Sequence, residues 1–197
     1  SLNQFILSQS KKKNIKLGFL PTASRDNKKK IYLFYDRFKS LNIQLSHFNL
    51  CSTSDGFESW ILNKDIIYIG GGNTKFMLEF WKENNLIGIF KEIYNSGTVL
   101  SGVSAGAACW FDCFLTDSDG PGYKPLNGIG LLSGSFTPHY SDSKRAEKYR
   151  ENIKNKTLPD GIGVDDGVAV LFIDGNPTEV YSSRKGHNAY FVDQNKQ

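Results

Sequence analysis

The sequence predicts an α/β fold built around a mostly parallel sheet that is flanked by helices. Short apolar runs alternate with segments whose apolar residues recur at helical spacing, a pattern typical of βαβ units. Two glycine-containing turns each connect such a run to a helical segment. The length of 197 residues favours a single domain, which we expect to span residues 1–197.

The expected elements of the first half follow from these patterns. Residues 15–20 are apolar and end at Pro21, which indicates a buried strand. In residues 26–40 the apolar side chains fall on one face of a helix. The next expected elements are a strand at 43–48, a helix at 57–62, a strand at 65–69, helices at 74–81 and 86–95, and a strand at 98–103.

A further helix is expected to open over residues 104–110, after which the pattern changes. Residues 117–130 are rich in Gly, Pro, Asp and Ser, which indicates a loop. The remaining expected elements are a strand at 131–137, a helix at 144–156, and short strands at 161–164, 168–173, 179–182 and 190–192. No repeat or low-complexity linker marks a domain boundary.

The composition excludes several classes of protein. Hydrophobic residues make up 39% of the chain, enough for a packed core, and no apolar stretch approaches the ~18 residues of a membrane span. The net charge of +4 is mild. The lysines of residues 11–16 and 28–30 are not interleaved with aromatic residues, so we expect a solvated surface and no nucleic-acid partner.

The N-terminus and the cysteines favour the cytoplasm. The apolar residues precede the charged residues that begin at Lys11, which is the reverse of a secretory signal. Cys51, Cys109 and Cys113 are an odd number and predict no disulfide framework. Cys109 and Cys113 would share a helix face, but no second cluster completes a metal site. We therefore expect reduced thiols, a cytoplasmic location and no metal or organic cofactor.

Residues 102–106, Gly-Val-Ser-Ala-Gly, match the G-x-S-x-G pattern of a nucleophile elbow. A serine between a strand and a helix occupies a strained turn, and small neighbours let other backbone segments approach it. The Oγ of Ser104 would project above the carboxyl ends of the strands, where α/β folds bind ligands. The N–H of Ala105 could then face an oxyanion. The alternative is a glycine-rich turn without chemistry.

Residues 70–74, Gly-Gly-Gly-Asn-Thr, also stand between a strand and a helix. Such a backbone can cradle an anion, but the P-loop lysine and the G-x-G-x-x-G spacing are missing. Because parallel neighbouring strands end at one edge of a sheet, this loop should lie beside Ser104. We predict that Gly72, with Asn73, supplies the second oxyanion donor; the alternative is a tight turn.

His139 is the expected general base among the three histidines. It follows an expected strand, at the sheet edge where Ser104 should lie. His47 falls inside an expected strand, and His187 falls in a polar turn near the C-terminus. The residues alone leave open which carboxylate orients the base. The candidates are Asp112, Asp117, Asp119 and Asp142.

Three motifs together resemble the aspartyl dipeptidase, or peptidase E, family. They are Gly-Gly-Gly-Asn-Thr at residues 70–74, Gly-Val-Ser-Ala-Gly-Ala at residues 102–107 and Thr-Pro-His-Tyr at residues 137–140. The resemblance spans residues 15–182, and cyanophycinase belongs to the same wider group. It implies a fold similar to class I glutamine amidotransferases, a flavodoxin-like three-layer sandwich, with serine replacing their cysteine nucleophile.

The resemblance also implies roles for individual residues. The acid of a Ser-His-acid triad would be Asp119, fifteen residues after Ser104, with Asp117 as the second choice. The family's peptides carry an N-terminal aspartate, whose side chain Arg145 would grip through two bonds; Arg150 also matches a basic position. The segment before Arg145 is shorter than in typical aspartyl dipeptidases, and the loop after Asp119 differs, so both would reshape the substrate pocket.

The expected function is that of a serine-type exopeptidase or dipeptidase acting on small peptides, with Ser104 as nucleophile and His139 as base. One alternative is a cyanophycinase-like or other amide hydrolase. Another is a module that binds a small ligand without turnover. The spacing disfavours an α/β-hydrolase, because the 35 residues from Ser104 to His139 (139 − 104) are too few for the usual intervening βα units.

Overall fold

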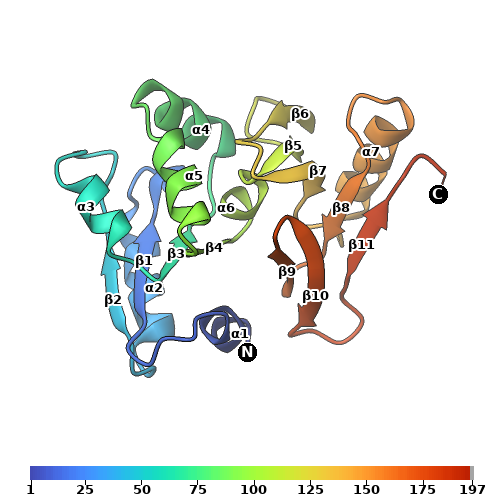
Figure 1. Cartoon of the computed structure of the whole chain (residues 1–197). Helices are drawn as coiled ribbons and strands as arrows, with labels where there is room; N and C mark the ends of the chain where they lie inside the picture. Colours follow the sequence, from blue (N-terminus) through green and yellow to red (C-terminus); the bar gives the residue numbers. More distant parts are fainter. Residues whose placement is uncertain (196–197) are drawn as a thin grey trace. The chain divides into compact units, whose positions relative to one another are not determined.

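The structure is a computed structural model that describes residues 1–195, and it has the α/β architecture predicted from the sequence (Figure 1). The chain divides into two compact units. One contains residues 3–107, and the other runs from residue 108 to the C-terminus and includes residues 1–2. Most strand pairs in the two larger sheets are parallel. The single domain expected from the length stays a prediction.

The unit of residues 3–107 contains a four-stranded parallel sheet in the order β2-β1-β3-β4. The strands of this sheet correspond to strands predicted from the sequence. Strands of a parallel sheet read as apolar runs because helices cover both faces of such a sheet. Its strands are β1 (Lys16–Leu20), β2 (Gln44–His47), β3 (Ile66–Ile69) and β4 (Val99–Gly102). The pairing of β3 with the edge strand β4 aligns Ile69 with Gly102, so the two strands end at the same level.

Helices supply the rest of this unit. They are α1 (Leu2–Ser8), α2 (Lys28–Phe38), α3 (Phe57–Leu62), α4 (Thr74–Glu83) and α5 (Ile87–Asn95). Phe34 and Phe38 of α2 pack with Leu17 and Phe19 of β1 in one buried cluster. Because neighbouring strand residues point to opposite faces, Gly18 faces the other side, where the Trp60 ring of α3 occupies the space above it.

The second unit contains a five-stranded sheet in the order β11-β8-β7-β5-β6, in which β5, β7 and β8 are parallel and the two outer strands antiparallel. Helix α7 (Ser143–Lys154) buries Tyr149 and Ile153 against Leu115, Leu158 and Val192. The strands are β5 (Phe111–Thr116), β6 (Lys124–Asn127), β7 (Leu132–Thr137), β8 (Gly161–Val164) and β11 (Ala189–Val192), with a separate hairpin of β9 (Val168–Ile173) and β10 (Asn176–Ser182).

The structure departs from the sequence prediction after Ser104. The helix expected over residues 104–110 is only α6 (Ala105–Ala108), and β5 follows it. The helix stops because the carbonyls of Cys109 and Trp110 accept hydrogen bonds from the N–H groups of Ile129 and Leu131. The expectation that Cys109 and Cys113 share a helix face is therefore wrong. Strand β6 lies inside the predicted loop, and α1 was not predicted.

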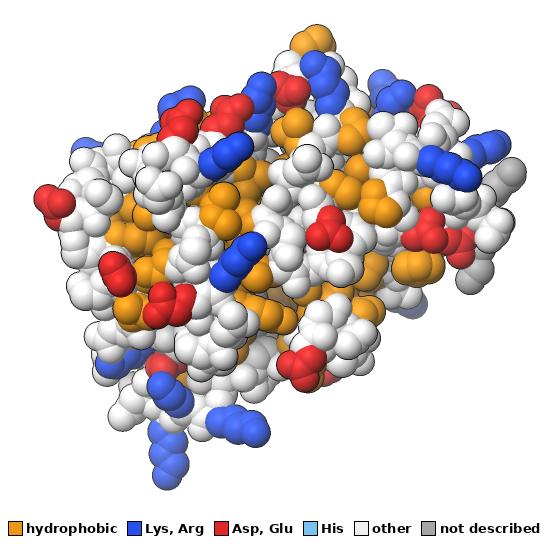
Figure 2. All heavy atoms as spheres, turned by 45° about the horizontal axis from the view of Figure 1, so that its top comes forward, with side chains coloured by type: hydrophobic (Ala, Val, Ile, Leu, Met, Phe, Trp, Pro, Cys, Tyr) orange, Lys and Arg blue, Asp and Glu red, His pale blue; other side chains and the backbone are white. Residues whose placement is uncertain are grey.

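The surface mixes charges of both signs. On the face shown in Figure 2, cationic and anionic side chains are interspersed, and apolar side chains show between them. Within residues 1–195, none of the helices combines the length and the apolar character that crossing a membrane requires.

Candidate active site

Ser104 occupies the predicted strand-to-helix turn between β4 and α6. Its backbone is left-handed, with a φ of +54°, a conformation that a non-glycine residue adopts at an energetic cost. The flanking glycines have no room for a side chain: a Cβ on Gly102 would lie 2.0 Å from the carbonyl oxygen of Gly106. A Cβ on Gly106 would lie 2.3 Å from the carbonyl oxygen of Ile69. The expected elbow geometry is thus present.

The glycine-rich loop of residues 70–73 lies beside this turn, as predicted from the neighbouring strands. A Cβ on Gly71 would lie 3.3 Å from the Cβ of Ser104 and 3.2 Å from the carbonyl oxygen of Val103. The contact arises because β3 and β4 are parallel neighbours that end at the same level. Both glycine motifs therefore converge at one edge of the four-stranded sheet.

The loop is anchored to the segment that follows β1. The N–H of Asn73 donates to the carbonyl oxygen of Ala23 at 2.7 Å. The Asn73 side chain accepts from the N–H of Phe76 and caps α4. A Cβ on Gly72 would lie 2.2 Å from the Ala23 carbonyl oxygen, so this close approach requires glycine. The N–H of Asn73 is thus already hydrogen-bonded to the backbone. Gly72 is the remaining candidate of this pair for an oxyanion donor.

The backbone N–H groups of Gly72 and Ala105 differ from that of Asn73. Within the described part of this unit, neither group donates a hydrogen bond to another residue. Ala105 is the first residue of α6, where helical N–H groups have no partner within the helix. Both groups are consequently available to an anion at this edge of the sheet.

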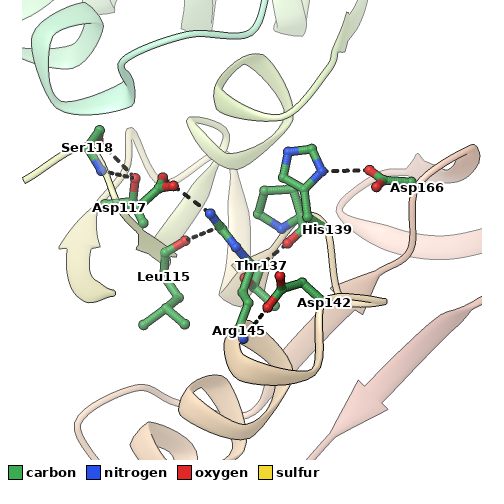
Figure 3. A network of polar contacts seen from close by, with 10 residues as sticks. Leu115, Asp117, Ser118, Thr137, His139, Asp142, Arg145 and Asp166 are labelled. Carbon is green, nitrogen blue, oxygen red and sulfur yellow. Dashed lines mark hydrogen bonds and ion pairs between the residues drawn. The ribbon is translucent and has the colours of Figure 1, made fainter. Parts of the chain in front are cut away.

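His139 lies in the second unit, just beyond β7, and is held by a carboxylate (Figure 3). Its backbone is left-handed, with a φ of +56°. The ring Nδ1 lies 2.6 Å from Oδ1 of Asp166. Because an ionised carboxylate only accepts hydrogen bonds, Nδ1 is the donor in this contact, which in the neutral ring places the lone pair on Nε2. The two side chains are 40% and 48% exposed, so the pair is open to solvent.

Asp166 was missed in the sequence analysis. It stands in the turn between β8 and β9, and β8 is the parallel neighbour of β7, with Thr137 paired to Gly163. A signal was present: Asp165-Asp166-Gly167 directly follows an expected strand. The same rule that joined the two glycine loops, that parallel neighbours end at one edge, could have joined His139 to Asp166.

Asp117 and Asp119, two of the four carboxylates considered in the sequence analysis, lie in the segment that follows β5. The carbonyl oxygen of Asp119 accepts a hydrogen bond from Nζ of Lys124 at 2.7 Å. Oδ1 of Asp117 lies 3.2 Å from Nη2 of Arg145 (Figure 3). The role of Asp119 as the triad acid stays a prediction.

The two predicted substrate-binding arginines differ in their surroundings. The Arg145 side chain is only 7% exposed, and besides Asp117 it contacts the carbonyl oxygen of Leu115 and stacks over the Tyr123 ring. Arg150 is exposed on α7 and donates to the Tyr140 hydroxyl at 3.1 Å. Arg145 is thus charge-compensated inside the unit, whereas Arg150 can meet a solute.

His47, Cys51 and Cys109 are poor candidates for catalysis. Nδ1 of His47 is bonded to the hydroxyl of Tyr35 at 2.8 Å, and burial lowers the pKa of His47 against the opposing charge of Asp26. Burial, with a contribution from Asp26, raises the pKa of Cys51 to about 11. Burial also raises the pKa of Cys109 well above its usual value. Neither thiol is a ready nucleophile at neutral pH.

Comparisons with known proteins identify the family. The model of peptidase family S51 matches residues 1–180. The chain belongs to peptidase family S51. The predicted resemblance to peptidase E is confirmed, since S51 relatives carry that name. Peptidase E of Haemophilus influenzae (strain ATCC 51907 / DSM 11121 / KW20 / Rd) is 31% identical over 134 residues, which cover 65% of this chain and 61% of that protein.

Two further similarities extend over nearly the whole S51 chain. The protein named "Uncharacterized peptidase YgaJ" from Bacillus subtilis (strain 168) is 44% identical over 194 residues, covering 98% of this chain and 84% of YgaJ. The crystal structure of a peptidase from an acI-B1 Actinobacterium has a TM-score of 0.72 at 16% identity. It covers 98% of this chain and 85% of the other, and it supports the fold.

The elbow geometry predicts that Gly106→Ala destabilises this S51 chain. The added methyl group would press on the Ile69 carbonyl oxygen, and overpacking of this kind costs about 1–3 kcal/mol in unfolding free energy. Gly88→Ala is the matched control, because Gly88 lies in α5 with nothing within 4 Å of an added Cβ. It should gain about 0.5–1 kcal/mol. Urea unfolding measures both, and equal midpoints would contradict the proposed close packing.

Proposed function

We propose that the protein is a serine-type peptidase that hydrolyses small peptides through an acyl-enzyme on Ser104. The observation that carries the proposal is the elbow at Ser104, which stands beside two backbone N–H groups that have no other acceptor. A nucleophile needs such donors, because the attacked carbonyl oxygen becomes negative and preorganised N–H groups stabilise that charge. Membership of a peptidase family makes an amide the natural target.

The proposed reaction begins when Ser104 Oγ attacks the amide carbonyl and His139 Nε2 takes its proton. The tetrahedral oxyanion is held by the N–H groups of Gly72 and Ala105. The imidazolium then returns its proton to the leaving amine, and water attacks the acyl-enzyme by the same route in reverse. Each step requires His139 Nε2 to reach Ser104 Oγ, which the first experiment below addresses.

We assign the orienting carboxylate to Asp166 in this proposal. A carboxylate at Nδ1 selects the tautomer whose Nε2 can accept a proton, and it stabilises the imidazolium that forms. Asp166 makes this contact at 2.6 Å. Asp119 is the alternative that the family resemblance favours, so the two residues are compared directly below.

We further propose that the substrates are small peptides, with N-terminal-aspartyl dipeptides as the first class to examine. The relatives named peptidase E support this choice. Arg145 could receive an acidic side chain only by exchanging its Asp117 partner, and that carboxylate is 66% exposed and replaceable. Arg150 is accessible without such an exchange. An acidic preference through these arginines is therefore testable residue by residue.

The first experiment uses a fluorophosphonate probe, which reacts with activated serines. We expect Ser104 to be labelled in the wild type, as located by peptide mass spectrometry. Ser104→Ala should abolish labelling, and His139→Ala should slow it by roughly a hundredfold or more, the usual scale of general-base catalysis. An unlabelled wild type that still binds small acidic ligands would instead indicate a binding module.

The second experiment separates the two carboxylates. Asp166→Asn should lower kcat/KM, and the rate of fluorophosphonate labelling, by roughly a hundredfold or more, because the amide can stabilise neither the tautomer nor the imidazolium. Asp119→Asn is the matched variant, with the same change of charge and volume. If Asp119→Asn shows the large loss and Asp166→Asn does not, the family-based assignment is correct and ours is wrong.

The third experiment measures specificity with dipeptides that differ only at the first residue. We expect kcat/KM for an Asp-first peptide to exceed that for its Asn-first counterpart. Arg150→Met should reduce this ratio about tenfold if the guanidinium contacts the acidic group, which corresponds to ~1.4 kcal/mol. Equal rates for acidic and neutral peptides would reject the aspartyl preference while leaving the peptidase assignment in place.

A further inference from the structure

The carbonyl oxygen of Gly71 accepts a hydrogen bond from a lysine that belongs to another element. Nζ of Lys30, in the first turn of α2, donates to this oxygen at 2.6 Å. The ends of the loop are fixed separately: the N–H of Gly70 donates to Leu20, and that of Asn73 donates to Ala23. Two peptide units lie between these anchors, and Lys30 acts on the second of them, the unit that joins Gly71 to Gly72.

The geometry of a peptide unit transmits this contact to Gly72. The carbonyl of one residue and the N–H of the next lie in one plane and point in opposite directions when the bond is trans, and no cis peptide bond occurs among the described residues. A donor that holds the Gly71 carbonyl thus also fixes where the Gly72 N–H points. A charged donor polarises the amide as well, which strengthens its N–H as a donor to an anion.

The position of Lys30 is not explained by the stability of its helix. Lys28, Lys29 and Lys30 occupy the first turn of α2, which has no acidic residue. Cations at a helix N-terminus oppose the helix dipole and are mildly destabilising. Lys30 and Gly71 also line a cavity with the rings of Phe34 and Tyr68, and the hydrogen bond between them lies at its exposed surface.

We propose that Lys30 is a positioning residue that aims and polarises the Gly72 N–H toward the oxyanion. The inference rests on the proposed function, in which Gly72 is an oxyanion donor. Lys30 itself touches neither substrate nor Ser104 in this scheme. It stabilises the transition state through the peptide bond that it holds, so its removal should reduce kcat and leave KM nearly unchanged.

The test compares three variants of the full chain. Lys30→Met keeps the aliphatic stem but loses the donor, and we expect kcat to fall about tenfold, less than the 10²–10³-fold loss of a whole oxyanion donor. Lys30→Arg keeps a charged donor and should recover most of the activity. Lys29→Met makes the same change of charge one residue away, where the ammonium bonds to no described residue, and should match the wild type.

A second readout does not depend on turnover. The backbone amide resonance of Gly72 in a ¹⁵N–¹H correlation spectrum should move in Lys30→Met and stay in place in Lys29→Met. An unmoved resonance, or a kcat equal in the two methionine variants, would overturn the inference. So would an activity loss that tracks a lower melting temperature and is not recovered by Lys30→Arg.

The two readouts separate this inference from the proposed function. A wild type that neither reacts with fluorophosphonate nor cleaves any peptide refutes the peptidase proposal. The Gly72 resonance then decides the inference alone: a shift specific to Lys30→Met supports the control of this peptide by Lys30, and its absence refutes it. If the enzyme is active but the Gly72 resonance does not move in Lys30→Met, the inference is refuted and the peptidase proposal stands.

Discussion

Direct backbone packing around Ser104 is the constraint on which the rest of the candidate site depends. Gly106 packs against the end of β3, and Gly102 packs against Gly106. Both contacts are so close that a Cβ atom on either glycine would clash with a backbone carbonyl. This packing holds the serine in a left-handed conformation between a strand and a helix. The parallel pairing of β3 with β4 brings both strands to the same level and sets the glycine-rich loop next to the nucleophile. Close packing and strand register together thus position the serine and the neighbouring loop.

The chemistry proposed here is divided between the two units of the chain. The unit of residues 3–107 supplies the nucleophile, the Gly72 and Ala105 N–H groups and the lysine that holds the Gly71 carbonyl. The unit that begins at residue 108 supplies the imidazole, its carboxylate and the arginines. Asp166 holds His139 within the second unit, and Lys30 holds the Gly71 carbonyl within the first. Catalysis by this scheme requires the two sets to meet around a bound peptide.

The elements of the parallel sheet were predictable because their signals are local. An apolar run ending in glycine or proline, followed by an amphipathic segment, identifies β1, β3 and β4 and the helices after them. The region after Ser104 was harder, since Phe111, Phe114 and Leu115 fit either a helix or a strand. The choice is made by pairing with residues 124–137, a long-range contact that no local pattern reports.

The site shows the same division between local and long-range information. Ser104 and Gly72 could be predicted from sequence because each lies in a glycine motif of fixed spacing between a strand and a helix. His139 could be predicted because it directly follows an expected strand. Asp166 is 27 residues from His139 in the chain, and only the pairing of β7 with β8 brings it near. The internal pairing of Arg145 with Asp117 was likewise hidden, because both residues look exposed in sequence.

The most direct measurement is a crystal structure of the protein after reaction with a fluorophosphonate. The account predicts a phosphonyl group on Ser104 Oγ, with one oxygen about 3 Å from the nitrogens of both Gly72 and Ala105 and the His139 ring beside the modified serine. An adduct whose phosphonyl oxygen points to solvent, with the imidazole of His139 turned away from it, would contradict the account.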